Sequence, residues 1–110
     1  MKPQHVTLTT SVLALTDLTQ RRFVGFDGGI CAAGTKALGV VEVDTGAGNM
    51  APSNVLGVIL VEAGAAIAAG AEVQSDAAGK AITKAAGVGN GFAWDAAAAA
   101  GDVIRIVRGI

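Results

Sequence analysis

Few side chains in this sequence are of the types that carry out catalysis, and they are widely spaced. Cys31 and His5 are the only cysteine and the only histidine, so they are the one thiol and imidazole that could act as a nucleophile and its base. No sequence context supplies a group to orient them, and no second histidine or cysteine stands at metal-binding spacing. We therefore expect no enzyme activity and no metal site, with Cys31 buried as a small apolar side chain and His5 at the surface.

Two glycine-containing stretches match parts of nucleotide-binding motifs. GAGNMA, at 46–51, has the glycine spacing of dinucleotide sites, but the pyrophosphate in such sites rests on the N-terminus of a crossover helix. Pro52 follows at once and a strand begins near Val55, which leaves no room for that helix. Gly79-Lys80 lacks the upstream glycine of a phosphate loop, because Gln74 stands there. We expect a loop and a hairpin at these two places and no cofactor, while a small nucleotide-binding domain that uses 46–51 remains an alternative.

Charge and composition argue against nucleic acid and membrane as partners. The net charge is −1, and the eight basic residues are spread over the chain, whereas binding a phosphate backbone requires clustered Lys and Arg. Arg105 and Arg108 lie three apart in a strand-like segment, so they should face opposite ways. The longest run of larger apolar residues, 55–61, is too short to span a bilayer. The first ten residues contain no apolar segment of the kind found in signal peptides.

The elements that must position these side chains are short and β-like. Segments rich in Val, Ile and Phe are bounded by Gly, Asp, Asn or Ser, which is typical of an all-β domain. Asp27–Gly29 predicts a tight reversal, and SDAAGKAI predicts a hairpin with Gly79 in a left-handed conformation. Residues 44–54 have the composition of a loop, because Pro52 cannot donate a ladder hydrogen bond. VLGVILV, at 55–61, should be covered on both faces, either as the central strand or as a subunit contact.

Alanine is placed in a recurring phrase. Ala-Ala-Gly precedes a β-branched or apolar run at Gly34, Gly70 and Gly101, so we expect a glycine turn at each of these strand entries. The alanine run between Asp95 and Gly101 predicts a single helical turn near 95–100, with Asp95 as the N-cap. Acidic residues at the other turns should likewise accept hydrogen bonds from backbone amides.

The core should be thin. The chain has 110 residues, 23 of them alanine, and only 33 larger apolar residues; Trp94 and Phe92 are expected among the buried ones. We predict a mainly β fold: a small single-domain β-sandwich or β-barrel of short antiparallel strands with one or two short helical turns. Residues 1–20 would form an N-terminal strand or arm and 21–110 the β-rich domain. Since a thin core often gains stability by association, we expect an oligomer or a docked subunit.

Three stretches together carry a family resemblance. RRFVGFDGG followed by AAGTKALGVVEV, then GAAIAAGAEVQSDAAGKAI, and finally AAAAAGDVIRIV resemble the capsid cement, or decoration, proteins of tailed bacteriophages over most of residues 20–108. The first half is also similar in layout to the lambda-type head decoration protein. The resemblance implies a β-rich structural protein of the virion, on the outer surface of the capsid, that cements neighbouring major capsid protein subunits. It implies homo-oligomers as well, commonly trimers, with dimers also found.

The N-terminal stretch departs from the family's more glycine-rich pattern, so its role rests on physical reasoning alone. The threonine-rich segment contains His5, Val6, Thr7, Leu8 and Thr9, and it is suited to adding an edge strand to a capsid subunit by main-chain pairing. We expect these five residues to contact the capsid. A β-rich module of another phage assembly, such as a tail or fibre, is the alternative function.

Overall fold

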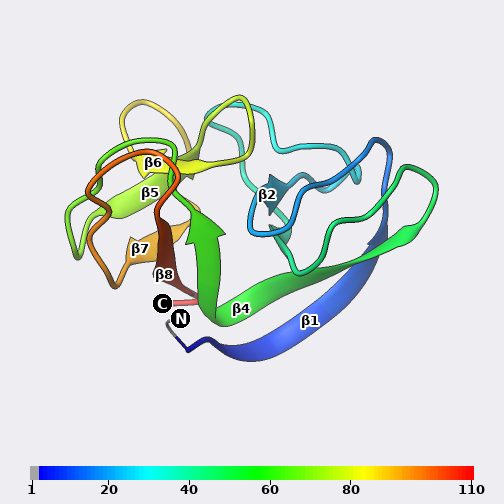
Figure 1. The fold of residues 1–110 in the computed structure, drawn as a ribbon, viewed down its shortest axis with the longest axis horizontal. Coiled ribbons are helices and arrows are strands. Elements are labelled where there is room, and N and C mark those ends of the chain that lie inside the picture. The colour runs from blue at the N-terminus through cyan, green and yellow to red at the C-terminus, as the bar shows by residue number, and fades with distance from the viewer. Residues whose placement is uncertain (1–2) are drawn as a thin grey trace.

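The computed structural model describes residues 3–110 and builds them from strands and turns, with no helix in this range. The strands are β1 (His5–Leu13), β2 (Phe23–Val24), β3 (Gly39–Val41), β4 (Met50–Glu62), β5 (Glu72–Ser75), β6 (Ala81–Thr83), β7 (Gly91–Ala93) and β8 (Val103–Arg108). They form one antiparallel sheet in the order β2-β3-β4-β8-β7-β5-β6, and β1 adds to β4 (Figure 1). The mainly β, single-domain fold is therefore confirmed.

The sheet curls until its two ends nearly meet, which makes it a barrel. Phe23, at the start of β2, donates its N–H to the carbonyl of Gly79 in the turn before β6, at 2.7 Å. A parallel bridge also joins Ala63, just after β4, to Ala81. These contacts pair part of the backbone at both terminal strands, which an open sheet would leave unpaired.

β4 is the central strand. It pairs with β1 along one edge over Met50–Val58, and along its other edge with β3 and then with β8 over Gly57–Glu62. The apolar run 55–61 lies on this central strand, which is one of the two alternatives that the sequence left open. Cover on both faces is confirmed only for Ile59, Leu60 and Val61, because Leu56 is 38% exposed. The loop expected over 44–54 is wrong from Met50 onward. Pro52 is tolerated there because it stands at the end of the β3 ladder. Its carbonyl accepts the N–H of Glu42 at 2.9 Å. Proline has no N–H to donate back to Glu42, so the ladder lacks only this last hydrogen bond.

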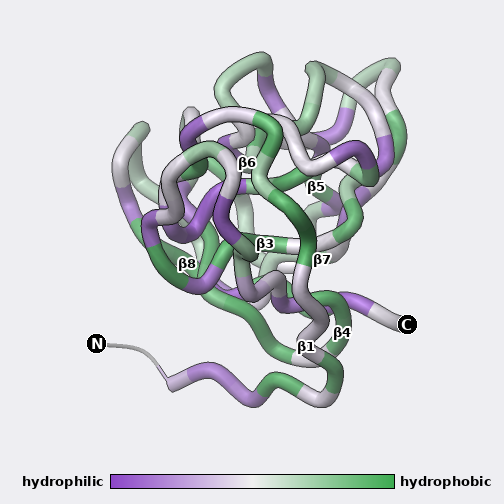
Figure 2. The backbone as a smooth tube through the Cα atoms, turned by 90° about the vertical axis from the view of Figure 1, so that its right-hand side faces the viewer, coloured by the Kyte–Doolittle hydropathy of each residue, from purple (hydrophilic) through white to green (hydrophobic). Residues whose placement is uncertain are grey.

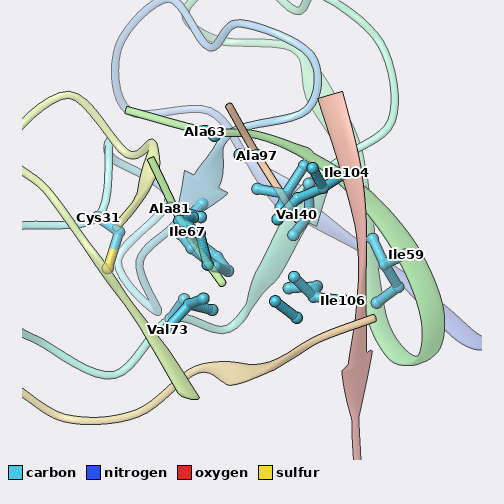
Figure 3. Close-up of a cluster of buried hydrophobic side chains, with 14 residues drawn as sticks. Cys31, Val40, Ile59, Ala63, Ile67, Val73, Ala81, Ala97, Ile104 and Ile106 are labelled. Atoms are coloured by element: carbon cyan, nitrogen blue, oxygen red, sulfur yellow. The ribbon is translucent and has the colours of Figure 1, made fainter. Parts of the chain in front are cut away.

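Two hydrophobic clusters fill the structure. The larger one lies inside the barrel and combines branched side chains, such as Ile59, Ile104 and Ile106, with several alanines (Figure 3). Cys31 belongs to it and is buried, as expected. The smaller cluster consists of Ala14, Leu18, Val24, Val41 and Ala51. Seven of the 19 residues in the two clusters are alanines, so close backbone approach supplements the packing of larger side chains in this fold.

The Ala-Ala-Gly phrases are β-turns of one kind. In each, the residue after glycine donates its N–H to the carbonyl of the first alanine, and the glycine has a positive φ of 70°, 85° or 93°. The three turns are Ala32–Thr35, Ala68–Ala71 and Ala99–Asp102. A positive φ at the third position is what a type II turn requires, so the expected role of this phrase as a turn is confirmed.

The helical turn expected over 95–100 is not formed. Ala97 instead makes an antiparallel bridge to Ile67, with its N–H 2.9 Å from the Ile67 carbonyl. The carboxylate of Asp102, which follows the alanine run, accepts hydrogen bonds from the N–H groups of Ala98 and Ala99. Asp95, the expected N-cap, binds Arg105 instead. A single turn of helix has too few hydrogen bonds to offset its nucleation cost, and the small Ala97 side chain is buried in the core cluster.

Candidate interaction surface

β1 lies at the margin of the molecule and presents one open edge. Among residues 3–110 it pairs only with β4 (Figure 1). The direction of its backbone groups follows from Pro52, whose carbonyl points to Glu42 on the β3 side of β4. Pro52 is the register partner of Ser11. Since N–H and C=O alternate in direction along an antiparallel strand, Ser11 and Thr9 direct their backbone groups away from β4, and Thr10 directs its own toward it.

The chemistry of β1 is unusual for an exposed edge. No Lys, Arg, Asp, Glu or Pro occurs between His5 and Leu13, although charges and prolines are the common means of protecting such an edge from pairing. Register shifts interrupt the ladder around Thr7 and Leu8, whereas Thr9–Leu13 runs in regular register against Met50–Asn54. The regular, uncharged part of the edge is therefore Thr9–Leu13.

The structure places all five predicted contact residues on β1. The side chains of His5, Thr7, Leu8 and Thr9 are exposed, and that of Val6 is half-buried and packs against the larger core cluster. Figure 2 shows both hydrophilic and hydrophobic stretches along this N-terminal segment. Val6 therefore anchors the strand, and the other four are accessible. Their role as capsid contacts stays a prediction.

A polar cluster near the start of β1 holds the strand in place. Gln4 donates from Nε2 to Oε1 of Glu42 at 3.0 Å. Oε1 of Gln4 accepts the N–H of Leu60 at 3.1 Å. Asn54 donates to the other oxygen of the same carboxylate at 3.1 Å. Sequence reasoning missed this cluster because Gln4 and Glu42 stand 38 residues apart and no local pattern links them.

Large apolar side chains are exposed where β1 ends. Leu13 and Met50 are register partners on β1 and β4, and each is 57% exposed. Leu15 donates its N–H to the carbonyl of Gly28, in the turn that carries Phe26, and both Leu15 and Phe26 are 68% exposed. These four residues form the apolar end of β1, next to its regular open edge.

The expected burial of Trp94 and Phe92 is wrong. Trp94 is 53% exposed, and the guanidinium of Arg105 lies 4.2 Å from its ring centroid. Arg105 also donates from Nε and Nη2 to the two oxygens of Asp95, at 2.9 Å each, and this hydrogen bonding raises the pKa of Arg105. No basic residue lies near Trp94 in the sequence, and the cation that contacts its ring, Arg105, comes from the neighbouring strand β8. Arg108 is buried and Arg105 is partly exposed, which confirms the prediction that they face opposite ways.

The candidate groups for catalysis and cofactor binding are not assembled into a site. Cys31 is buried with its Sγ 3.3 Å from Oγ1 of Thr35, and His5 is exposed on β1. Within residues 3–110, His, Cys, Asp and Glu form no group able to hold a metal ion. The GAGNMA stretch turns at Gly48 and leads directly into β4. The described chain also has no helix with the length and apolarity needed to cross a membrane.

Comparison with known proteins decides the family. The family model described as phage cement protein matches residues 1–108. The chain belongs to the phage cement protein family. Like other members of the family, this cement protein is a structural component of a phage virion and associates with the capsid. The resemblance found in the sequence is thereby confirmed.

The fold of the cement protein also occurs in a solved structure, that of the head fiber gp8.5 N base of bacteriophage phi29. The two chains superpose with a TM-score of 0.74 over 93% of each, at 21% sequence identity. At this identity the likeness establishes a shared fold. No curated protein matches the sequence.

Proposed function

We propose that this cement protein binds the outer surface of the phage head and stabilises contacts between neighbouring major capsid protein subunits. It acts without catalysis. A protein that binds the assembled shell but not its dissociated subunits shifts the equilibrium toward the intact shell. The effect grows with the number of copies bound, because each copy contributes its own binding free energy.

The observation that carries the proposal is the open edge of β1. Thr9 and Ser11 direct unpaired backbone groups outward from a strand that contains no charge and no proline. An extended segment of the major capsid protein can add to this edge by main-chain hydrogen bonds, with side chains on alternate positions giving selectivity. The apolar end of β1 would then lie against the same partner, where burial of Leu13 and Met50 adds hydrophobic stabilisation.

A place on the outside of the head is supported by the shared fold. The similar solved protein is described as a head fiber base, and a base of that kind is more compatible with the head than with the tail. Labelling of intact particles tests this directly. Label on heads supports the proposal, and label confined to tails would favour a tail or fibre module instead.

We also propose that the cement protein acts as a homo-oligomer, a trimer rather than a dimer. Its core depends heavily on alanine, and several large apolar side chains are exposed, so association would bury surface that the isolated chain leaves in water. A native mass measurement on the isolated protein gives the number of subunits. A monomer at the concentrations found in infected cells would contradict this part of the proposal.

The sharpest test of the docking edge is a matched pair of substitutions at one position. Ser11→Pro removes an N–H that points away from β4 and leaves the β1–β4 ladder intact, whereas Ser11→Ala changes the exposed side chain and keeps the N–H. We expect Ser11→Pro to weaken binding to expanded capsids by about tenfold, which corresponds to one well-formed hydrogen bond, and Ser11→Ala to bind normally.

Two further variants complete this test. Thr10→Pro removes a donor that faces β4 and should destabilise the fold, so it shows what loss of the internal ladder looks like. Deletion of residues 1–9 is less informative, because it also uncovers the β4 residues that β1 covers. If Ser11→Pro folds normally and binds capsids as tightly as the unmodified protein, pairing at this edge is not how the cement protein docks.

A further inference from the structure

Three segments of the chain meet beyond the apolar end of β1. They are residues 13–20, 25–30 and 43–50, and we call them the distal loops. Leu15 in the first segment donates its N–H to the carbonyl of Gly28 in the second, at 3.0 Å. Leu18 in the first and Thr45 in the third exchange backbone hydrogen bonds of 2.8 and 3.0 Å. In Figure 1 the loops that follow β1 and precede β4 lie on the side away from β5, β6 and β7, so the distal loops form one end of the molecule.

The distal loops expose an unusual amount of apolar surface. They make up about a fifth of the chain, yet six of the twelve large apolar side chains that are exposed within residues 3–110 belong to them. These six are the four residues of the apolar end of β1 together with Ile30 and Val43, which are 45% and 47% exposed. Exposed apolar side chains that gather on one part of a monomer mark an interaction surface, whereas scattered ones need no explanation.

Every charge on the distal loops is negative. Asp17, Asp27 and Asp44 are all exposed, and these loops contain no Lys, Arg or His. Arg21 and Glu42 flank the loops with opposite charges, so counting both of them leaves the balance at −3. The whole chain carries a net charge of −1, which makes the rest of the molecule net positive. The exposed apolar surface at this end therefore lies in a negative electrostatic field.

Two of these carboxylates are held in fixed positions and keep one oxygen for a partner. Oδ1 of Asp17 accepts the N–H of Ala47 at 2.9 Å, and Oδ1 of Asp27 accepts the N–H of Gly29 at 2.9 Å. The ion pairs found within residues 3–110 involve other carboxylates. Oδ2 of Asp17 and of Asp27 therefore remains available. Because the backbone already orders both side chains, a cation that binds them loses little affinity to side-chain ordering.

This combination of features narrows the class of partner. Nucleic acid and an anionic membrane surface would be repelled by the negative charge. A second copy docked through the same face about a twofold axis would place these carboxylates against each other, and like charges oppose such a contact. A protein segment that presents cations beside apolar side chains is complementary to both the charge and the apolar surface.

We propose that the distal loops bind a segment of the capsid partner in which Lys or Arg residues stand next to large apolar residues. The apolar residues would cover Leu15 and Phe26, and the cations would pair with Asp17 and Asp27. The inference rests on the proposed docking function and adds the chemistry of the partner, because the regular edge Thr9–Leu13 is uncharged and cannot select by charge. Opposite charges on the two surfaces also speed their encounter at low salt.

The first experiment removes the charge and keeps the turns. Asparagine retains an Oδ1 acceptor for the backbone N–H, so Asp17→Asn and Asp27→Asn are combined in one variant. We expect its dissociation constant for expanded capsids to rise by about tenfold at low salt, and by less at high salt, where screening weakens the pairs in the unmodified protein. The matched control combines Glu72→Gln with Asp102→Asn, which lie outside the distal loops and change the net charge equally. The control should bind as the unmodified protein does.

The apolar part of the surface has its own pair of variants. Phe26→Ser removes an aromatic side chain that is 68% exposed, and Val88→Ser alters one that is 48% exposed outside the distal loops. Both changes are at the surface, and thermal unfolding checks that both proteins fold. We expect Phe26→Ser to weaken capsid binding by at least about tenfold through lost apolar contact and Val88→Ser to bind normally. If Phe26→Ser instead reduces the number of subunits in a native mass measurement, the surface belongs to a second copy and the proposal is overturned.

Peptides separate this inference from the docking function. The unmodified protein, labelled with ¹⁵N, is titrated with a capped Leu-Lys-Leu-Lys-Leu peptide and with its Leu-Glu-Leu-Glu-Leu counterpart while the backbone amide signals of Leu15, Asp27 and Ala47 are followed by NMR. We expect saturable shifts with the lysine peptide and at least about tenfold weaker binding of the glutamate peptide, because attraction is replaced by repulsion.

The outcomes distinguish the two proposals. If the unmodified protein binds capsids and the double asparagine variant binds them equally tightly at low salt, the docking function stands and the basic partner segment is wrong. If the unmodified protein does not bind capsids, the docking function is wrong and the peptides alone decide the inference. Equal responses to the two peptides, or no saturable response to the lysine peptide, would then overturn it.

Discussion

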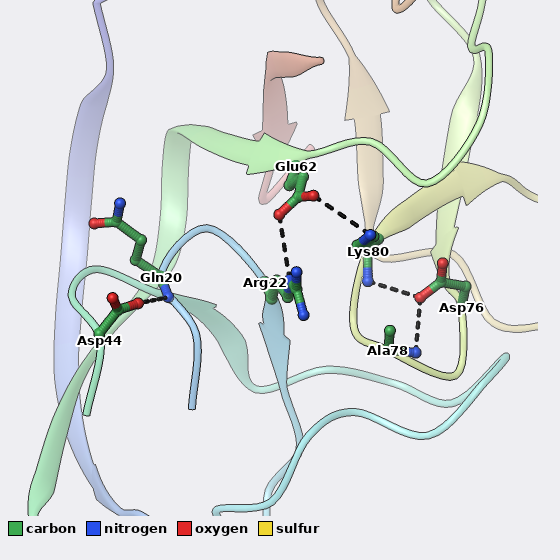
Figure 4. A network of polar contacts seen from close by, with 7 residues as sticks. All are labelled: Gln20, Arg22, Asp44, Glu62, Asp76, Ala78 and Lys80. Atoms are coloured by element: carbon green, nitrogen blue, oxygen red, sulfur yellow. Dashed lines mark hydrogen bonds and ion pairs between the residues drawn. The ribbon is translucent and has the colours of Figure 1, made fainter. Parts of the chain in front are cut away.

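Glu62 and Arg22 join the two ends of the sheet. Oε1 of Glu62 accepts a hydrogen bond from Nε of Arg22 at 3.2 Å, and its Oε2 lies 3.5 Å from Nζ of Lys80 in the turn before β6 (Figure 4). Arg22 immediately precedes β2, and Glu62 is the last residue of β4. A single carboxylate at the end of the central strand therefore holds both terminal strands, and the backbone contact between Phe23 and Gly79 lies beside it.

Replacing Glu62 by glutamine should loosen this closure. We expect Glu62→Gln to lower the free energy of unfolding by about 1 kcal/mol at low salt, since the pair is partly buried and joins two cations, and by less at high salt, where screening weakens the pair in the unmodified protein. Denaturant unfolding at two salt concentrations measures both. Lys84→Gln, an exposed change, is the control and should have almost no effect. If the loss of unfolding free energy does not depend on salt, hydrogen bonding and not charge joins Glu62 to Arg22 and Lys80.

The glycines of the Ala-Ala-Gly turns should resist substitution for a conformational reason alone. Gly70 and Gly101 have positive φ, and an added Cβ would meet no atom within 4 Å at either position. Gly70→Ala and Gly101→Ala should therefore each cost about 1 kcal/mol through backbone strain, as measured by thermal or denaturant unfolding. Gly46→Ala provides the comparison, because Gly46 has no positive φ and its nearest contact is at 3.4 Å. Equal costs at all three positions would rule out φ as the cause.

The carboxylate of Asp102 should stabilise the turn at the end of the alanine run. It accepts the N–H groups of Ala98 at 2.8 Å and Ala99 at 3.3 Å. We expect Asp102→Ala to lower the free energy of unfolding by about 1 kcal/mol, in the range of a lost helix cap, and Asp102→Asn, which keeps one acceptor oxygen, to lose less. Unfolding curves for the two variants give the order. Equal losses in the two variants would mean that the carboxylate acts through its charge, because both variants remove the charge and only asparagine keeps an acceptor oxygen.

The contact between Trp94 and Arg105 can be followed by fluorescence, because Trp94 is the only tryptophan. Asp95→Asn removes the charge that fixes the guanidinium over the ring, so the emission of the folded protein should change in intensity or wavelength. Asp44→Asn alters a different carboxylate, which accepts the N–H of Gln20, and should leave the emission unchanged. An unaltered spectrum in Asp95→Asn would show that the guanidinium stays on the ring without its partner.

Capsids provide the test of cementing itself. Expanded capsids saturated with the protein should lose integrity at a higher temperature than capsids without it, because binding favours the assembled shell. Ser11→Pro, added at the same concentration, should give a smaller increase. Calorimetry or light scattering on the particles measures the transition. Identical transitions with and without bound protein would contradict a cementing role.

The sequence was most informative where a structural feature is completed within a few residues. The reversal at Asp27–Gly29 forms as predicted, with the Asp27 carboxylate accepting the N–H of Gly29. The hairpin after β5 follows the same logic, since Asp76 accepts two backbone amides around Gly79. In both, an aspartate and a positive-φ glycine specify the turn without help from the rest of the chain.

Features that depend on strand register were not predictable from the sequence. Arg105 reaches Trp94 because β8 pairs with β7. The order of strands in the sheet differs from their order in the sequence, since β5 lies next to β7 and not next to β4. The exposure of Trp94, the strand at Pro52 and the unpaired Nη1 of Arg108 all follow from long-range pairing. The helical turn was predicted from local propensity, and a bridge between Ala97 and Ile67 displaced it.

The pairing of β1 with β4 also determines how this protein would carry a mechanical load. β1 is joined to β4 through eight register pairs, and the same β4 continues into the ladder with β8 inside the barrel. A pull along the axis of β1 therefore loads all of these pairs together, in shear, whereas a pull across the strand would open them one after another. A partner bound to the open edge would transmit tension through β1 into the barrel in the resistant direction. Orientation on the shell, and not only affinity, would then determine how much stretching the attachment withstands.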